Sequence, residues 1–292
     1  MKTVIPKMRL NQLKLSRLVQ AVVVIGTFSS LWMLSRLNSH DLNKTPLIHR
    51  TLGVWSTFYD EHWERDVQTS LVNNGYIVFC DREGSMTNIT HPEIYRRIYK
   101  VAPNTIRIDK LASDKDVLAK PGEKPLNART ELRLQGFQLS PDRTYRVTIQ
   151  ILFDQTDFSA VFLQIYARDK FNKASVIFQT QVKNGWFSVR RWLTDRVVRG
   201  DMEQVELMSL KTDQWMTWEY EFCLTNKGSD GFIRLFIDGF GAYEFKGQTY
   251  WTESSFSFWI QTGVYENIMN SGKRQSLLFR NIKLESMDRM DS

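Results

Sequence analysis

The sequence has few of the residues on which many scaffolds and sites depend. Its two cysteines, Cys80 and Cys223, are far apart, which excludes a disulfide-dense scaffold and a cysteine-rich metal cluster. They either form one disulfide in an oxidising compartment or stay free, buried in strands. Gly-rich phosphate loops, the HExxH motif and the nucleophile elbow are all absent. The four histidines are His40, His49, His62 and His91.

The net positive charge is also small once the basic N-terminus is set aside. The formal net charge is +7, from 39 basic and 32 acidic residues. Residues 1–17 contain five of the basic residues and no acidic one, which leaves 34 basic and 32 acidic residues for the rest. A nearly balanced chain has no general attraction to a phosphate backbone. The sequence therefore predicts no nucleic-acid partner.

One long uncharged run follows the basic N-terminus. Residues 18–34 read LVQAVVVIGTFSSLWML, between Arg17 and Arg36. As a helix this run would be about 25 Å long, at the short end for a membrane span. Large residues at its end, where signal cleavage needs small ones, favour an uncleaved transmembrane anchor over residues 18–35. The preceding charges predict a cytoplasmic tail over residues 1–17 and an extracytoplasmic main domain, which is periplasmic, luminal or at the cell surface.

Beyond a polar stalk over residues 36–50, the composition favours β structure. Aromatic residues make up 13% of the chain and suit half-buried strands. Short alternating runs between Gly, Pro, Asn and Asp predict an all-β domain over residues 51–292. A meander over residues 213–250, followed by a long strand and a closing strand, is typical of a concanavalin-like β-jelly-roll sandwich. The predicted fold is therefore this sandwich, preceded by one N-terminal transmembrane helix.

The expected elements follow from the same alternation. Strands are predicted over residues 76–80, 105–109, 129–137, 144–152, 160–167, 175–182, 217–224, 231–237, 241–245, 256–265 and 277–285. Helix is expected only over residues 92–99 and for a turn or two within residues 190–205. The stretch 109–127 is predicted to be a long surface loop.

The first of three polar motifs is R-T-E-L-R. In a strand, Arg129, Glu131 and Arg133 share one face while the residues between them face the core. A guanidinium held beside a carboxylate is suited to bind a substrate carboxylate through two hydrogen bonds. The alternative is a charged ladder on a solvated sheet face.

The second motif is Q-I-Y, within the apolar strand AVFLQIYA. Gln164, Tyr166 and Arg168 share one face of that strand. Polar groups in the middle of an apolar strand are costly unless they line a solvated face or find partners. The alternative is an ordinary amphipathic strand.

The third motif lies in FSFWIQTGVYEN. Trp259, Gln261, Gly263 and Tyr265 share one face of the predicted strand. Glycine within a strand marks the close approach of a ligand or of another backbone, and Tyr265 would stand beside the space that the glycine leaves. The alternative for Tyr265 is packing in the core or at its rim.

The order of these motifs resembles polysaccharide lyase family 7, the alginate-lyase type, and its jelly-roll relatives. These carry R-(S/T)-E-(L/V)-R, Q-I-H and Y-F-K-A-G-x-Y on neighbouring strands of a concave sheet. The resemblance covers residues 125–285. It implies that Arg129 and Gln164 bind and neutralise a uronate carboxylate, and that Tyr265 is the catalytic tyrosine.

The sequence departs from the family at two positions. Tyr166 stands where the family has His, and Gln261 stands where it has Lys. No histidine follows in the motif region, so Tyr265 would act first as base and then as acid in a syn elimination. A tyrosinate needs nearby cations to lower its pKa from ~10, and Arg129, Arg133 and Arg168 are candidates.

These observations predict a site and leave the function open between three classes. The predicted catalytic residues are Tyr265, Arg129, Gln164 and Tyr166, and the predicted substrate-binding residues are Glu131, Arg133, Arg168, Trp259 and Gln261. The first class is a membrane-anchored lyase that cleaves an acidic, uronate-containing polysaccharide by β-elimination. The second is a non-catalytic carbohydrate-binding or adhesion module, and the third is a structural ectodomain. The expected partners are an acidic polysaccharide and, through residues 18–35, the membrane.

No cofactor is expected. The Asp/Asn-rich turn 226–230 has two interpretations, a solvated turn or a structural calcium site.

Overall fold

The computed structural model describes residues between positions 48 and 287. The described ranges are 48–63, 65–74, 76–80, 86–87, 92–114, 128–134, 139–168, 174–192, 202–228, 230–250, 257–266 and 273–287. All belong to one compact unit, Leu47–Ser292. The predicted tail and anchor lie outside these ranges, as does most of the stalk. Within the ranges, no helix is long and apolar enough to cross a membrane.

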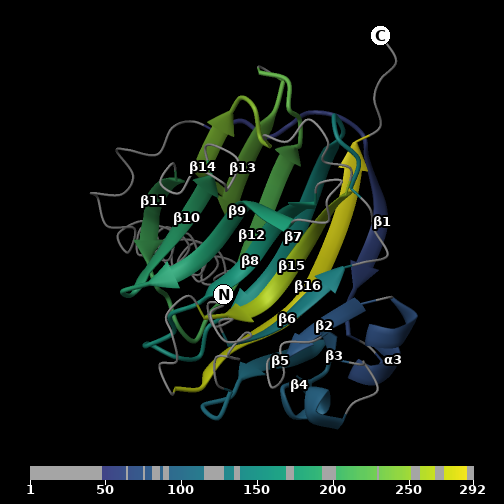
Figure 1. Cartoon of the computed structure of the whole chain (residues 1–292), viewed down its shortest axis with the longest axis vertical. Helices are drawn as coiled ribbons and strands as arrows, with labels where there is room; N and C mark the ends of the chain where they lie inside the picture. Colours follow the sequence, from purple (N-terminus) through teal and green to yellow (C-terminus); the bar gives the residue numbers. More distant parts are fainter. Residues whose placement is uncertain are drawn as a thin grey trace, which may run out of the picture. The chain divides into compact units, whose positions relative to one another are not determined.

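Two antiparallel sheets lie face to face in this unit (Figure 1). Sheet A contains, in spatial order, β14 (Phe240–Lys246), β13 (Phe232–Ile237), β12 (Trp215–Cys223), β7 (Thr144–Leu152), β16 (Gln275–Met287), β5 (Thr105–Lys110) and β4 (Ile98–Ala102), and β1 (Trp55–Glu61) pairs with β16. Sheet B contains β11 (Met202–Ser209), β10 (Trp186–Trp192), β9 (Ala174–Lys183), β8 (Val161–Arg168), β15 (Ser257–Tyr265), β6 (Arg129–Leu134), β2 (Tyr76–Cys80) and β3 (Met86–Thr87). Neighbours in sequence are often separated in space, as expected for a jelly roll.

The core lies between the sheets and follows from alternation along each strand. On β7, Tyr145, Val147, Ile149 and Ile151 are buried and the residues between them are partly exposed. An aromatic cluster occupies the centre and joins both sheets, with rings that meet at steep angles. Its members are Phe153, Phe158, Phe162, Phe187 and Trp218. Burying each such side chain contributes roughly 1.5–3 kcal/mol, so this cluster is a main source of the sandwich's stability.

Two short helices lie at one end of the sheets, beside β2 and β4 (Figure 1). The helix α3 (Val67–Asn73) begins after Asp66, whose carboxylate accepts a hydrogen bond from the Thr69 amide at 2.9 Å. The 3₁₀ helix η1 (Pro92–Arg96) leads directly into β4. The helix predicted over residues 92–99 is therefore only partly right, because its second half pairs with β5 as a strand.

The first described residues, 48–54, lie on the outer face of sheet A and are called the entry segment below. The Thr51 amide donates to Glu221 at 2.9 Å, and Arg234 donates to the Thr51 hydroxyl at 2.8 Å. Arg50 forms an ion pair with Glu219 at 2.5 Å. Glu221 is fully buried under these contacts. The entry segment is therefore fixed to the sheet that lies opposite sheet B.

Most predicted strands are confirmed. Within residues 190–205, the described residues 190–192 and 202–205 belong to β10 and β11, which pair with each other, and the rest of the range in which a turn or two of helix is predicted lies outside the described residues. The strand β10 directs Phe187 and Val189 into the core, and β11 is an edge strand whose charged residues hide its alternation. Cys80 and Cys223 are buried in β2 and β12 and are not joined in a disulfide, which settles the choice left open by the sequence.

Candidate functional site

The three polar motifs lie on adjacent strands of sheet B. The motif R-T-E-L-R forms β6, Q-I-Y lies in β8, and β15 runs between these two strands. Gln261 on β15 lies opposite Arg133 on one side and opposite Gln164 on the other. Directly opposite residues share a face of a sheet, so the motifs contribute to one surface, as the sequence predicts.

That surface is crossed by an unbroken row of polar residues, one from each of six strands. In spatial order the row contains Arg133, Gln261, Gln164, Gln179, Arg190 and Gln204. The sequence motifs account for only the first three. The sequence could have indicated Gln179, because Gln179 and Gln181 alternate with buried residues in a predicted strand and therefore share one face.

The strand register separates the four predicted catalytic residues into two pairs. Tyr265 lies opposite Arg129, and Tyr166 lies two residues from Gln164 on β8. Gln164 is level with Gln261, which precedes Tyr265 by four residues and lies about 13 Å from it along the strand. Arg129 and Tyr265 therefore form one end of the site, and Gln164 and Tyr166 belong to the other.

At the first end, Arg129 lies between two aromatic rings. Its guanidinium carbon is 5.9 Å from the centre of the Tyr265 ring and 5.0 Å from that of Phe79 on β2. Its Nη1 is 3.8 Å from Oε2 of Glu131. Arg129 and Tyr265 are both partly exposed. Phe79 was not predicted as a site residue, although it also lies opposite Glu131.

The middle of the site is a buried hydrogen-bonded bridge. The Gln261 amide donates to Glu131 Oε2 at 2.5 Å and accepts from Arg133 Nη2 at 3.5 Å. Glu131 and Gln261 are each 1% exposed, so these groups form a floor rather than a binding surface. The bridge connects the Arg129 end to the Arg133 end.

The second end is a cluster built around Trp259, which we call the tryptophan cluster and which consists of Arg133, Tyr166, Arg168 and Trp259. The Tyr166 ring stacks on Trp259 with 5.3 Å between ring centres and 5° between planes. The guanidinium carbons of Arg133 and Arg168 lie 4.4 and 5.1 Å from the centre of the Trp259 ring. Burial and the neighbouring Arg168 charge lower the pKa of Arg133 to about 10, so Arg133 is still charged at neutral pH.

A chain of hydrogen bonds continues from this cluster across sheet B. The Tyr166 hydroxyl donates to Gln164 Oε1 at 2.9 Å, and Gln164 donates to Gln179 at 3.2 Å. Gln179 in turn donates to Gln181 at 3.3 Å, and Gln181 donates to Ser188 at 3.0 Å. The chain fixes the orientation of the Gln164 amide, since each link uses a defined donor and acceptor.

Gly263 marks the close approach of another backbone rather than of a ligand. Its φ is +140°, and a Cβ at this position would lie 2.3 Å from the Thr130 carbonyl oxygen of β6. The space that the sequence led us to expect beside Tyr265 is therefore occupied by the neighbouring strand. The pairing with β8 also shifts register between Thr262 and Tyr265.

The two histidines among the described residues lie away from the site. His49 belongs to the entry segment on sheet A, and His62 Nδ1 lies 3.1 Å from Oδ1 of Asn281 on β16. His40 and His91 lie outside the described residues. Within the described ranges, no group of three or more His, Cys, Asp or Glu side chains is arranged to hold a metal ion.

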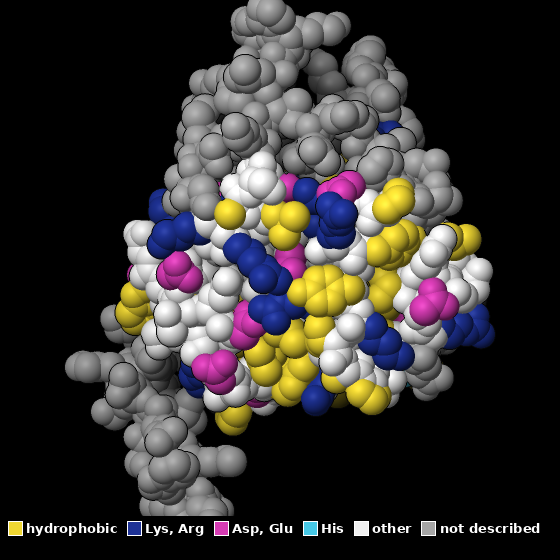
Figure 2. Space-filling model, turned by 90° about the horizontal axis from the view of Figure 1, so that it is seen from below, with side chains coloured by type: hydrophobic (Ala, Val, Ile, Leu, Met, Phe, Trp, Pro, Cys, Tyr) yellow, Lys and Arg dark blue, Asp and Glu magenta, His cyan; other side chains and the backbone are white. Residues whose placement is uncertain are grey.

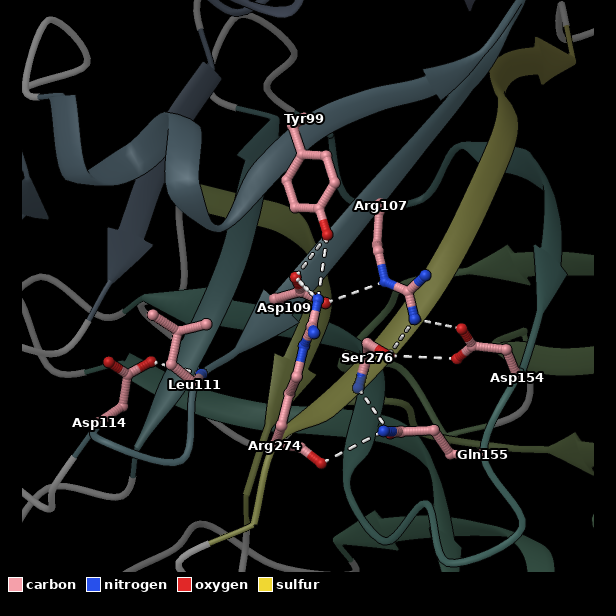
Figure 3. A network of polar contacts seen from close by, with 9 residues as sticks. All are labelled: Tyr99, Arg107, Asp109, Leu111, Asp114, Asp154, Gln155, Arg274 and Ser276. Atoms are coloured by element: carbon pink, nitrogen blue, oxygen red, sulfur yellow. Dashed lines mark hydrogen bonds and ion pairs between the residues drawn. The ribbon is translucent and has the colours of Figure 1, made fainter.

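Charge on sheet A is balanced. Figure 3 shows buried Asp109 between Arg107, Arg274 and the Tyr99 hydroxyl, with Arg107 also reaching Asp154. Two arginines here face two carboxylates. Figure 2 shows the domain from below, where basic, acidic and hydrophobic side chains all lie on the surface. Among the described residues of the site, Arg129 lies 3.8 Å from Glu131, and Arg133 lies within the influence of both the Glu131 and the Arg168 charges.

Comparison of the sequence with protein-family models and with curated proteins finds no match. The fold, however, matches solved structures of polysaccharide lyases. Alginate lyase A1-II', a member of polysaccharide lyase family 7, aligns with a TM-score of 0.56 at 9% identity, over 77% of this chain and 100% of that one. The alginate lyase from Corynebacterium sp. aligns at 0.54 and 12% identity, over 76% of this chain and 99% of that one.

A third alginate lyase of family 7, AlgAT5, aligns at 0.51 and 13% identity, over 76% of this chain and 99% of that one. At such identities the likeness shows the fold. The chain is an all-β protein of two antiparallel sheets, similar in fold to the family 7 alginate lyases. This confirms the structural resemblance that the motif order implied.

Proposed function

We propose that the chain is a membrane-anchored polysaccharide lyase that cleaves an acidic, uronate-containing polysaccharide by β-elimination. One observation carries the proposal: the register of β6, β15 and β8 gathers arginines, amides and tyrosines on one face of sheet B. The fold likeness supports it. Structures of A1-II' variants hold a product (GGG) and a substrate (GGMG), so a sheet sandwich of this kind accommodates oligosaccharides.

The reaction needs a neutralised carboxylate and a base. Removal of the C5 proton leaves an electron pair that forms the C4=C5 double bond as the C4–O4 bond breaks. The proton is acidic enough only when the adjacent carboxylate is neutralised. In the proposal Arg129 binds that carboxylate, because it is the partly exposed guanidinium beside Tyr265.

Tyr265 takes the proton and then returns it. As a tyrosinate, Tyr265 accepts the C5 proton, and the phenol that results donates this proton to O4 of the departing sugar, so one residue completes a syn elimination. Arg129 supplies the positive charge that this role requires beside the ring.

Gln164 and Tyr166 are assigned to the neighbouring part of the polymer. The Gln164 amide is oriented by its hydrogen bonds to Tyr166 and Gln179 and, because it is 1% exposed, it supports Tyr166 from below. The partly exposed ring of Tyr166, which stacks on buried Trp259, offers an apolar surface for a sugar ring. Arg133 and Arg168, which are partly exposed, complete the proposed binding surface, and Glu131 and Gln261 form the buried floor beneath it.

The anchor belongs to the proposal and is supported by the sequence alone. The uncharged run 18–34 and the basic residues before it predict that the lyase domain lies outside the cytoplasm, where this domain would meet its polysaccharide.

A second candidate function is a non-catalytic carbohydrate-binding module. The observation that favours it is the absence of an imidazole from the described site, because the hydroxyl of Tyr166 is instead engaged with Gln164 and the amide of Gln261 with Glu131. Tyr166 and Gln261, the two residues that depart from the family pattern, thus belong to the hydrogen-bonded network of the site.

Product formation separates the two candidates. The full chain is incubated with alginate, glucuronan and heparin-type chains, and the ultraviolet absorbance of the new conjugated double bond is followed. We expect absorbance with at least one polymer. Tyr265→Phe should reduce its rate at least about 100-fold, since a general base contributes 10²–10⁴. Tyr99→Phe, which removes a hydroxyl on sheet A, is the matched control and should leave the rate unchanged.

Three results are informative. Binding without absorbance would exclude the lyase and support the binding module. Absorbance that survives Tyr265→Phe would overturn the assignment of Tyr265. Neither binding nor absorbance would exclude both candidates.

A further inference from the structure

Two irregularities of strand pairing meet in sheet B beside Tyr265. The strand β15 has one residue more than β8 between two of their pairs, which are Thr262 with Leu163 and Tyr265 with Val161. The pairing of β15 with β6 continues without a shift over the same residues. The extra residue is therefore a β-bulge on the β8 side of β15, and Gly263, with its φ of +140°, lies within it.

A second bulge lies next to the first, on β8. The pairing of β8 with β9 shifts between Val161 and Leu163, where β8 has Phe162 as an extra residue. Strict alternation from Gln164 would turn Phe162 to the outer face, but its ring belongs to the central aromatic cluster. The second bulge thus lets Phe162 enter the core and leaves Val161 on the outer face, level with Tyr265.

One hydrogen bond joins the two bulges. The Thr262 hydroxyl donates to the Phe162 carbonyl oxygen at 2.8 Å, and both residues are almost wholly buried. A bulge disrupts the ladder of backbone hydrogen bonds at its own position. A side-chain donor that binds a backbone carbonyl there holds the two irregular strands in one arrangement, because a buried carbonyl is costly to leave without a donor.

The bulge on β15 changes the position of Tyr265 relative to Gln164. In a regular pairing Val264 would lie opposite Val161, and Tyr265 would be level with a residue one further from Gln164. In the structure Tyr265 is level with Val161, which is three residues from Gln164 on β8 rather than four. Since one residue of strand is about 3.3 Å long, the bulge brings the Tyr265 end of the site nearer to the Gln164 end by about that distance.

We propose that Thr262 is a positioning residue for Tyr265. Its hydroxyl holds the bulge of β15 against β8, and the bulge sets where the phenol lies relative to Arg129 and Gln164. Thr262 is 0% exposed, so it acts through the backbone and not by contact with a ligand. The inference rests on the proposed function, in which Tyr265 is the base. A reacting group misplaced by about 1 Å can lower a rate about 100-fold.

The first experiment measures steady-state kinetics of the full chain on the polymer that gives the largest ultraviolet absorbance. Thr262→Val removes the hydroxyl and keeps the shape of the side chain. We expect it to lower kcat about tenfold and to leave KM unchanged, because the substrate contacts remain while the base is displaced. Thr262→Ser restores a hydroxyl and should recover most of kcat.

Thr105→Val is the matched control. Thr105 is also buried, and its hydroxyl also donates to a backbone carbonyl, that of Pro103 at 3.2 Å, but it lies at the start of β5 in sheet A. Its kcat should equal that of wild type. Thermal unfolding shows that each variant is folded, and Thr262→Ala with Thr105→Ala takes the place of the valine variants if these do not fold.

A spectroscopic measurement reports the surroundings of Tyr265 without turnover. Fluorotyrosine is introduced at position 265 of the full chain and of each variant, and the fluorine NMR resonance is recorded. We expect Thr262→Val to move this resonance, because the ring changes its position beside Arg129. Thr262→Ser and Thr105→Val should leave the resonance in place.

The results distinguish this inference from the lyase proposal. If product forms, an unchanged kcat in Thr262→Val, or an equal loss in Thr105→Val, would overturn the positioning role while the lyase stands. If no product forms, the lyase is excluded and the fluorine resonance decides. Movement in Thr262→Val alone would then support the positioning of Tyr265 by Thr262, and a resonance that stays in place would overturn it.

Discussion

At Gly263 the chain adopts a φ of +140° and lies against the Thr130 carbonyl of β6. A methyl group there would overlap backbone that is held by strand pairing on both sides of β15. We expect Gly263→Ala to lower the free energy of unfolding by roughly 2–4 kcal/mol, through strain and displacement of β6. Denaturant titration measures this change.

Gly185→Ala is the control for that prediction. Gly185 also has a positive φ, +75°, but a Cβ there would meet nothing within 4 Å. Only the conformational cost remains, about 1–2 kcal/mol. Equal losses in the two variants would show that contact with Thr130 is not what requires glycine at position 263.

At the scale of elements, a buried ion pair joins the end of β5 to the end of β15. Lys110 Nζ lies 2.6 Å from Glu266 Oε2 and also donates to the Lys273 carbonyl at 2.9 Å. Both side chains are almost wholly buried. Glu266 follows Tyr265 directly, so the pair also fixes the end of the strand that carries the proposed base.

We expect Lys110→Met to destabilise the fold by about 3–5 kcal/mol, because it leaves the Glu266 carboxylate buried without its cation. The double variant Lys110→Met with Glu266→Leu should lose much less, since no uncompensated charge remains. Chemical unfolding of wild type, both single variants and the double variant completes the cycle. A double variant as unstable as Lys110→Met would mean that the loss comes from packing rather than from charge.

How far the sequence predicts the fold depends on the element. The strand β7 alternates strictly between core and surface, so both its ends are predicted at Thr144 and Leu152. The strands β10 and β11 were missed because Arg190, Arg191 and the acidic residues of β11 interrupt the apolar period, although cross-strand pairs such as Arg191 with Glu203 satisfy them. Which charged residues become partners depends on how the strands pair in the folded protein, so the sequence of either strand alone does not reveal it.

The same limit applies to the candidate site. Residues that share a face follow from positions i and i+2, and this placed Arg133, Gln164 and Gln261 on one surface correctly. The distance between motifs depends on the pairing register of neighbouring strands, which the sequence of a single strand does not determine. The separation of Arg129 and Tyr265 from Gln164 and Tyr166 was therefore invisible in the sequence.

At the scale of the whole domain, buried tyrosines link stability to high pH. Burial, with a smaller contribution from Glu203, raises the pKa of Tyr243 to about 12, and burial also raises the pKa of Tyr59, Tyr76 and Tyr220. The unfolded chain releases these protons near pH ~10, whereas the folded chain retains them to higher pH. The folded state therefore binds more protons in this window, and stability must fall as pH rises through it.

We expect the free energy of unfolding to be constant with respect to these groups below about pH 10 and to decrease above it, by up to ~1.4 kcal/mol per pH unit for each tyrosine. Tyr243→Phe should make that decrease less steep. Urea unfolding at about pH 9, 10 and 11 tests both statements. An identical slope in the variant would show that Tyr243 does not contribute.

The entry segment determines how the domain responds to tension on its N-terminal side. A pull at residue 48 is resisted first by the contacts of Arg50 with Glu219 and of Thr51 with Glu221, and then by the pairing of β1 with β16. All of these bonds belong to sheet A. The strands β6, β15 and β8 carry none of them, so a chain that is tethered by its N-terminus can bear mechanical load while the face proposed to bind polysaccharide keeps its geometry.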